Sequence, residues 1–327
     1  MALRRAWSVY HTRRNARLAM QDSMQYLKAK ATVATRQKGH RAHIGSWLGL
    51  TVALCLLIYY LIVFVVPFSI AVWLSFHNWD FIVDPKFVGL RNYQRMFNDG
   101  YFWQAVRVTV TFSAVEISIA IAIGLVLAFL LSRLRGIAQR SILALFYLPV
   151  IIPSVVSVLL WRWLYISNGG AFNVLLTSLG LPPQPFLLSS EQALYCIIVM
   201  VIWTFLGSVM VLFLAGINEI PEHLIEAAML DGAGLWRQFW YIILPLLRPV
   251  IVYQVVVSVI GTFQLFEQFV FLSGPGFSTR TLAVYTYQLG FQSLDLGYGA
   301  AVSMFIFVAL LIATAVQLRR LHATFEY

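Results

Sequence analysis

Charged side chains are scarce in this sequence. Asp, Glu, Lys and Arg make up 11% of its 327 residues, whereas a soluble globular protein carries about 25%. Hydrophobic residues account for 60%, and the mean hydropathy is +0.80. This composition excludes an ordinary water-soluble domain and predicts an integral membrane protein.

The sequence also lacks the residue patterns of an enzyme or a metalloprotein. It has no glycine-rich phosphate loop ending in Gly-Lys-Ser or Gly-Lys-Thr, so we do not expect the chain to hydrolyse ATP itself. Its two cysteines, Cys55 and Cys196, lie inside apolar stretches and form no Cys-x-x-Cys pair, which favours packing roles over a disulfide or a metal site. The six histidines are scattered without ligand spacing. We therefore predict no catalytic set, no metal site and no cofactor bound by this chain.

Long apolar stretches predict the fold class. A helix needs about 20 apolar residues to cross the hydrocarbon of a bilayer. Three stretches that contain no Asp, Glu, Lys or Arg exceed this length, and three more are nearly as apolar. We expect an all-α polytopic inner-membrane protein with six transmembrane helices, within residues 42–79, 108–131, 141–163, 192–218, 249–272 and 296–318.

The positive charge of the chain is unevenly distributed. Its net charge is +10, and residues 1–43 alone hold ten Lys or Arg against one acid, Asp22. With Arg107 and Arg162 left out as helix-end residues, the termini and the second and fourth loops hold 17 basic residues, against four in the other loops. The positive-inside rule then places both termini in the cytoplasm. The basic segment is interpreted as a topology anchor held by anionic lipid, with a regulatory role as the alternative, and not as a nucleic-acid site.

The polar stretch between the fourth and fifth apolar spans predicts a protruding helical loop. Pro221 suits the first turn of a helix, and Gly232 allows the positive φ with which a helix commonly ends. A second short helix over 235–243 would return to the membrane and stop at Pro245. Small residues would permit close approach of a partner's backbone, while Glu226 and Asp231 could pair with its cations.

This loop resembles the coupling loop of binding-protein-dependent ATP-binding-cassette importers. The shared pattern is Glu226-Ala227-Ala228, then Gly232, then nine residues, then Ile242-Ile243-Leu244-Pro245. In that family the membrane subunit places this loop in a cleft of a cytoplasmic ATPase. The resemblance implies that the residues coupling the chain to an ATPase are Glu226, Ala227, Ala228, Asp231 and Gly232.

The resemblance also implies partners, an organisation and a location. The partners would be a homologous second permease subunit, a cytoplasmic ATPase dimer that binds ATP and Mg, and an extracytoplasmic solute-binding protein. The location would be a bacterial or archaeal inner membrane. The chain would divide into a basic cytoplasmic segment (1–43), a first transmembrane helix (44–79), a permease core of five transmembrane helices (80–320, coupling loop 218–246) and a cytoplasmic tail (321–327).

Two outer-loop strings resemble the carbohydrate branch of this family, the permeases of maltose and glycerol phosphate type. They are Phe87-Val88-Gly89-Leu90-Arg91-Asn92-Tyr93 and the segment 170–181, with its G-x-x-N-x-x-L and L-G-L patterns. The implied cargo is a sugar or a sugar-like solute. A non-sugar cargo such as glycerol phosphate or an amino acid remains an alternative. An ATP-independent channel or carrier is another, although it leaves the loop pattern unexplained.

Polar residues within the fifth span predict the solute pathway. Gln254, Ser258 and Gln268 follow one stripe of a continuous helix, with Gln264 and Glu267 beside it. Amides and hydroxyls can exchange hydrogen bonds with a sugar at little net cost. The alternative is that these side chains bond between helices, and Glu267 could equally serve a buried donor. For Glu116, in the second span, we expect an interhelical hydrogen bond.

Overall fold

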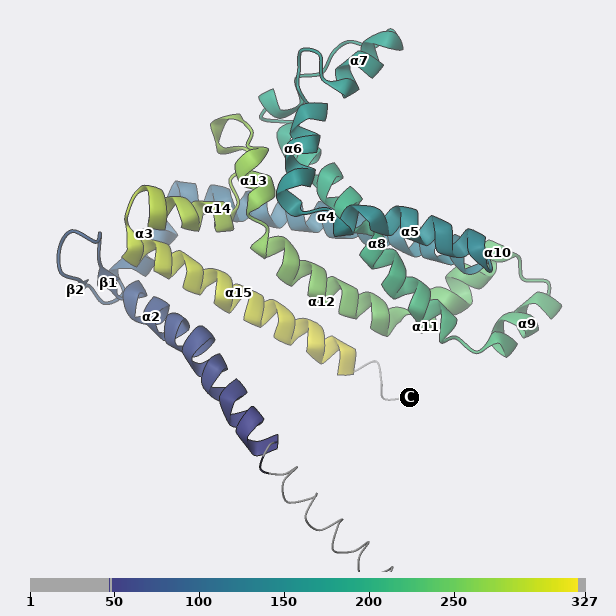
Figure 1. Cartoon of the computed structure of the whole chain (residues 1–327), viewed down its shortest axis with the longest axis horizontal. Helices are drawn as coiled ribbons and strands as arrows, with labels where there is room; N and C mark the ends of the chain where they lie inside the picture. The colour runs from purple at the N-terminus through teal and green to yellow at the C-terminus, as the bar shows by residue number, and fades with distance from the viewer. Residues whose placement is uncertain (1–46, 48, 323–327) are drawn as a thin grey trace, which may run out of the picture. The chain divides into compact units, whose positions relative to one another are not determined.

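The computed structural model describes residues 47 and 49–322. The basic segment 1–43 and the end of the predicted tail lie outside the described residues. In the described part the chain is mainly helical, with one short antiparallel hairpin of β1 (His77–Asn78) and β2 (Lys86–Phe87). From the hairpin onward the helices are α3 (Arg91–Asn98), α4 (Gly100–Ser132), α5 (Ile137–Ile151), α6 (Ser154–Leu164), α7 (Ala171–Ser178), η2 (Phe186–Leu188), α8 (Ala193–Asn218), α9 (Glu222–Leu230), α10 (Leu235–Gln238), η3 (Phe239–Ile243), α11 (Leu244–Leu246), α12 (Arg248–Gln264), α13 (Glu267–Phe271), η4 (Pro275–Phe277), α14 (Leu282–Tyr287), η5 (Gln288–Gln292) and α15 (Leu296–His322) (Figure 1).

The described part of the chain divides into two units, with the boundary between Ser69 and Ile70. The apolar helix Gly49–Ser75 crosses this boundary and is 27 residues long, sufficient for a bilayer. It includes a π-helical turn, η1 (Leu61–Val65), and then α2 (Val66–Ser75). Pro67 follows the π turn closely, as the second residue of α2. Because proline has no N–H and its ring crowds the carbonyl four residues earlier, a widened turn before it relieves the clash.

Among the described residues, four helices are long and apolar enough to span a membrane: Gly49–Ser75, Gly100–Ser132, Ala193–Asn218 and Leu296–Arg319. They agree in position with the first, second, fourth and sixth predicted spans. The second helix begins eight residues earlier than expected, because the side chain of Asp99 caps its first turn by accepting a hydrogen bond from the backbone N–H of Tyr101 (2.9 Å).

The third and fifth predicted spans are not continuous helices. The third is broken between α5 and α6 with a bend of 96°. Ile152 precedes Pro153 and has extended dihedrals (φ −71°, ψ 129°), as the residue before a proline prefers. The α10–α11 segment, which precedes the fifth predicted span, is bent by 68° relative to α12. In the described part of the chain, the count reaches six only if each bent pair is taken as one span.

The predicted stripe from Gln254 to Gln268 is also interrupted. Helix α12 ends at Gln264, Leu265 is extended (φ −62°, ψ 123°), and α13 begins at Glu267. The expectation of one helix over 249–272 was therefore wrong. No proline or glycine of the sequence marks this break. The first turn of α13 instead contacts α6, where the hydroxyl of Ser154 donates to the carboxylate of Glu267.

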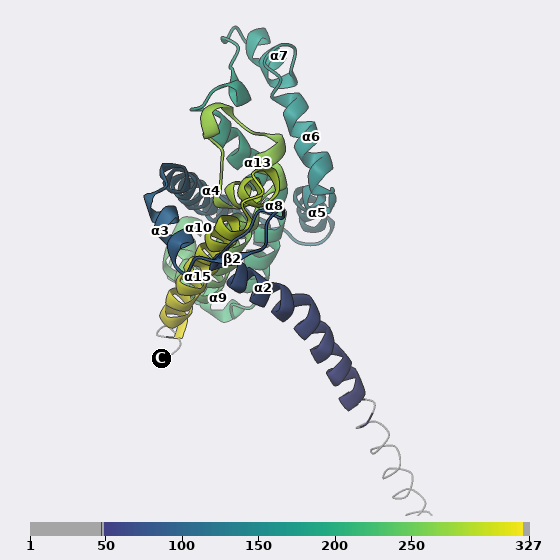
Figure 2. The same cartoon turned by 90° about the vertical axis from the view of Figure 1, so that its left-hand side faces the viewer.

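The core of the 70–327 unit forms around α4 and α8, which pack against each other with α5 beside α8 (Figure 1). Gly207 of α8 makes the approach of α5 possible, because a Cβ atom there would overlap the carbonyl oxygen of Phe146. Figure 1 and Figure 2 both place α7, which follows α6, and α9 on opposite sides of this unit.

The two loop strings that resemble carbohydrate permeases, residues 87–93 and 170–181, have structural roles. The side-chain amide of Asn92 donates to the carbonyls of Ser75 (2.9 Å) and His77 (3.0 Å). Asn173 donates to the carbonyls of Ser167 and Gln184 and accepts from the N–H of Gln184. Both asparagines are buried. Each asparagine therefore forms hydrogen bonds with backbone groups of a loop, because buried polar groups need hydrogen-bond partners.

A tyrosine–carboxylate cluster joins the start of α4 to α14 and α15. The hydroxyls of Tyr285 and Tyr298 both donate to Asp99, the latter at 2.6 Å. Burial opposes ionisation of Asp99, but these hydrogen bonds and the bond from Tyr101 N–H outweigh it, and the pKa of Asp99 lies below its usual range. Burial, together with the bond to Asp99, raises the pKa of Tyr285 to about 12. The cluster fixes the N-terminal end of α4.

We predict that Gly207→Ala destabilises the protein because the added methyl meets the backbone of α5. Overpacking of this kind costs about 1–3 kcal/mol, which thermal unfolding in detergent would detect as a lower Tm. The control is Gly261→Ala on α12, where no atom lies within 4 Å of the added Cβ. Equal Tm values for the two variants would contradict the close approach of α5 and α8.

Candidate functional site

Helix α9 carries the predicted coupling residues and ends as expected. Pro221 is its N-cap, and Glu222 lies in the first turn, where a carboxylate complements the helix dipole. Gly232 has φ 76°. Its N–H donates to the carbonyl of Met229 (3.0 Å), and the N–H of Ala233 donates to the carbonyl of Ala228 (2.9 Å). This is a Schellman ending, in which two backbone bonds fix the direction of the chain after the helix.

No residue of α9 is buried. Leu230 is 89% exposed, Met229 is 52% exposed, and the side chains of Glu226 and Ala227 are exposed. Asp231 is exposed, whereas Ala228 is half-buried. The structure thus brings all five predicted coupling residues onto one short helix and its exit. Apolar side chains left exposed on such a helix are typical of an interaction surface.

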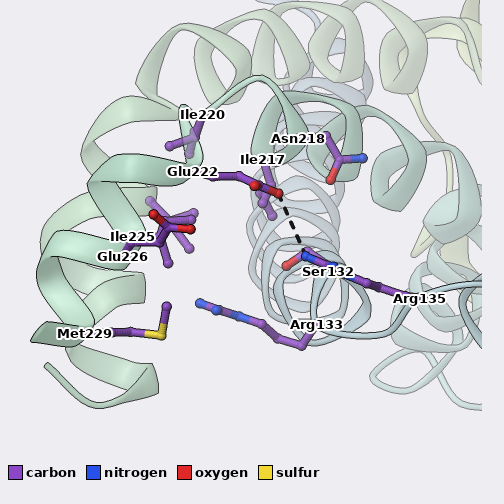
Figure 3. A pocket seen from close by; sticks show the side chains of 11 residues that line it. Ser132, Arg133, Arg135, Ile217, Asn218, Ile220, Glu222, Ile225, Glu226 and Met229 are labelled. Carbon is purple, nitrogen blue, oxygen red and sulfur yellow. Dashed lines mark ion pairs between the residues drawn. The ribbon is translucent and has the colours of Figure 1, made fainter.

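A cavity of about 330 Å³ lies between α9 and the turn that follows α4 (Figure 3). Glu226 and Met229 line it from α9, and Arg133 lines it from the turn after α4. In Figure 3 the guanidinium of Arg133 points toward the α9 side of the cavity. Arg135 forms an ion pair with Glu222 at 3.8 Å, but both side chains are largely exposed, so the pair contributes little energy.

Gln238 links the exit of α9 to the end of α4. It is 3% exposed, and its amide nitrogen donates to the carbonyl of Ala233 (2.8 Å). Its amide oxygen accepts a hydrogen bond from the guanidinium of Arg133 (2.8 Å), which also lies over the ring of Phe129. Burial lowers the pKa of Arg133. Sequence reasoning missed Gln238 and Arg133. The available signal was the polar pair Arg237 and Gln238 in an otherwise apolar return segment.

A second cavity, of about 270 Å³, lies between α4, α8 and α12. Gln254 and Ser258 line it from α12, with the amide of Gln254 donating to the hydroxyl of Ser258 (2.9 Å). Ser208 and Phe205 of α8 and Glu116 of α4 form other parts of the wall. Two residues of the predicted solute pathway therefore share a cavity with a carboxylate that was not expected beside them.

The other predicted pathway residues are placed differently. Gln264 is exposed at the last residue of α12, and Gln268 is 5% exposed in α13. Glu267 is half-buried and is held by Ser154, in line with the alternative that it serves a buried donor. Because the helix breaks at Leu265, these three residues lie beyond the cavity lining and do not extend the Gln254–Ser258 stripe.

Comparison with known proteins agrees with this architecture. Residues 120–323 match the family described as the inner membrane component of binding-protein-dependent transport systems. The trehalose/maltose transport system permease protein MalF of Thermococcus litoralis is 34% identical over 83% of this chain and 92% of its own length. The probable starch degradation products transport system permease protein AmyD of Thermoanaerobacterium thermosulfurigenes is 29% identical over 87% of this chain and 96% of its own length.

The fold is also found in a solved structure. One such structure is the crystal structure of a bacterial ABC transporter involved in the import of the acidic polysaccharide alginate. One of its chains superposes on this chain with a TM-score of 0.76 at 23% sequence identity. The match covers 86% of this chain and 96% of that chain. At this identity the likeness concerns the fold. Since the family match covers more than half of the sequence and the helices are arranged as in such a permease, the chain belongs to the family of inner-membrane components of binding-protein-dependent transport systems.

Proposed function

We propose that this chain is the permease subunit of an ATP-driven importer for a sugar or sugar-like solute. It forms half of the translocation pathway beside a homologous second permease subunit. The observation that carries the proposal is α9, an exposed helix with a fixed exit that presents Glu226, Ala227 and Asp231. Relatives named for maltose, trehalose and starch products support a carbohydrate cargo.

In this proposal α9 docks on a cytoplasmic ATPase dimer, which binds ATP and Mg. An extracytoplasmic solute-binding protein delivers the cargo on the other side. The excess of basic residues in the termini and in the α4–α5 and α8–α12 loops supports an orientation with both termini and α9 in the cytoplasm.

Nucleotide binding can shift the permease between two states only if the ATPase contacts α9 differently in each state. The Gln238 bonds to Ala233 and Arg133 give a direct route from the exit of α9 to the end of α4. Helix α4 in turn lines the intramembrane cavity through Glu116. A displacement of the docked loop would therefore be passed to a wall of the solute pathway.

We propose that the pathway includes Gln254, Ser258, Gln264, Glu267 and Gln268. The first two line the cavity itself. The other three lie at the α12–α13 break, where a chain interruption within a membrane helix is tolerated if it lines a cavity or is covered by protein.

Gly232→Glu should abolish both ATP-driven uptake and co-purification of the ATPase. A non-glycine residue at φ 76° strains the Schellman ending by about 1–2 kcal/mol, and the long charged side chain would stand beside the docking surface. Uptake of maltose or trehalose into proteoliposomes and retention of the ATPase on the tagged permease are the measurements.

The matched control is Gly180→Glu, at a glycine with nearly the same φ (75°) in the loop after α7. Both variants should insert into the membrane, and only Gly180→Glu should retain the ATPase. Normal ATPase retention and uptake by Gly232→Glu would refute the docking surface.

Gln254→Ala and Ser258→Ala should each raise the KM for sugar uptake about fivefold, as expected for the loss of a hydrogen bond worth about 1 kcal/mol. Gln264→Ala and Gln268→Ala should change the relative uptake of different sugars. An unchanged KM for the first pair would exclude the cavity as the solute site. Unchanged kinetics for the second pair would remove those two residues from the pathway.

A further inference from the structure

Glu116 is a buried carboxylate in the middle of a membrane-spanning helix. It lies sixteen residues from the first residue of α4 and sixteen from the last, so neither helix end can solvate it. The residue is 5% exposed, and its Oε2 atom has no hydrogen-bond partner among residues 47 and 49–322. The interhelical hydrogen bond that the sequence suggested is not found at this oxygen.

Such a group is costly unless something satisfies it. An ionisable side chain at membrane depth usually faces a cavity or a partner and has a function. The described part of the chain offers Glu116 no cation, since none of the residues that line its cavity is basic. Glu116 instead lines a cavity of about 270 Å³, together with Gln254 and Ser258 on α12 and Ser208 on α8.

The cavity walls combine two kinds of surface. Phe205, Val201 and Val257 are apolar, while Glu116, Ser208 and the Gln254–Ser258 pair are polar. A few convergent polar groups in an apolar wall are typical of small-molecule sites, and the cavity volume is just below their usual range of about 300–1,000 Å³. Gly261 on α12 is exposed, and a Cβ atom built there would meet no atom within 4 Å. This side of the cavity is therefore free of packed side chains.

We propose that Glu116 is a specificity-determining residue that accepts hydrogen bonds from the hydroxyls of a neutral solute in this cavity and excludes acidic ones. This inference rests on the proposed function and adds the charge class of the cargo. A carboxylate accepts from two O–H donors at once, and charge-assisted bonds of this kind are the stronger ones. An anionic solute would have to bury its own charge in surroundings of low dielectric constant, where no basic side chain in the described lining compensates for it and any negative charge on Glu116 would repel it.

The test measures occupancy of the cavity without ATP-driven transport. In the full chain reconstituted in proteoliposomes, with Cys55→Ser and Cys196→Ala, a Ser258→Cys variant is labelled with a small methanethiosulfonate reagent. Maltose and trehalose serve as neutral probes and digalacturonate as the acidic one. The control is Ser303→Cys on α15, a half-buried serine of another membrane helix that does not line the cavity.

Maltose and trehalose should slow the labelling of Ser258→Cys, whereas digalacturonate should not. None of the three probes should change the labelling of Ser303→Cys. Adding Glu116→Gln should weaken protection by the neutral probes about tenfold, the effect of losing one charge-assisted hydrogen bond, and should allow protection by digalacturonate. Glu116→Asp, which keeps the charge, should restore discrimination against the acidic probe.

Equal protection with Glu116 and with Glu116→Gln would overturn the proposal, as would protection by the acidic probe in the parent chain. Absence of protection by any sugar would also overturn it. Each of these results would leave ATP-driven uptake by the parent chain intact. Failure of the proposed function would instead appear as loss of ATP dependence, whatever the labelling pattern.

Discussion

The hydrogen bonds of Gln238 are the constraint on which the account of this molecule depends. In the proposed function, the permease can respond to a cytoplasmic ATPase only if the loop that docks on it is joined stiffly to the helices of the solute pathway. Gln238 bonds to Ala233, immediately after the Schellman ending of α9, and to Arg133, immediately after α4. Because Gln238 is buried, breaking either bond would leave a polar group unsatisfied, which costs more than the bond itself contributes. The loop and α4 are therefore expected to move together.

Glu267 and Glu116 are carboxylates within apolar helical segments, where burying an ionisable group costs free energy, and the protein places them in different surroundings. Glu267 is satisfied within the protein by Ser154 and holds α13 against α6, at the place where α12 ends without any local signal. Glu116 lies in a continuous helix and lines a cavity, and its buried Oε2 has no hydrogen-bond partner among residues 47 and 49–322. Glu267 thus stabilises an irregular segment, whereas Glu116 keeps an acceptor oxygen without a partner in the described residues.

The features that were predictable from sequence are those that local chemistry determines. Gly232 was expected to take a positive φ after a short helix, and it does, because the Schellman ending is set by residues within one turn. The long apolar helices followed from length and composition alone. By contrast, the break at Leu265 depends on contact between α13 and α6, which are distant in sequence. The same holds for Glu116, whose neighbours across the cavity come from α8 and α12 and could not be recognised from its own helix.

The most direct test of the central claim is cross-linking from α9. A cysteine placed at the exposed position Ala227, in a chain lacking Cys55 and Cys196, should form a cross-link to the cytoplasmic ATPase in native membranes, and its yield should change when ATP is added. A cysteine at Leu188, 73% exposed in the loop before α8, should form none. Capture of the ATPase from position 227 alone would support the coupling role of α9; capture of no nucleotide-hydrolysing partner from that position would contradict it.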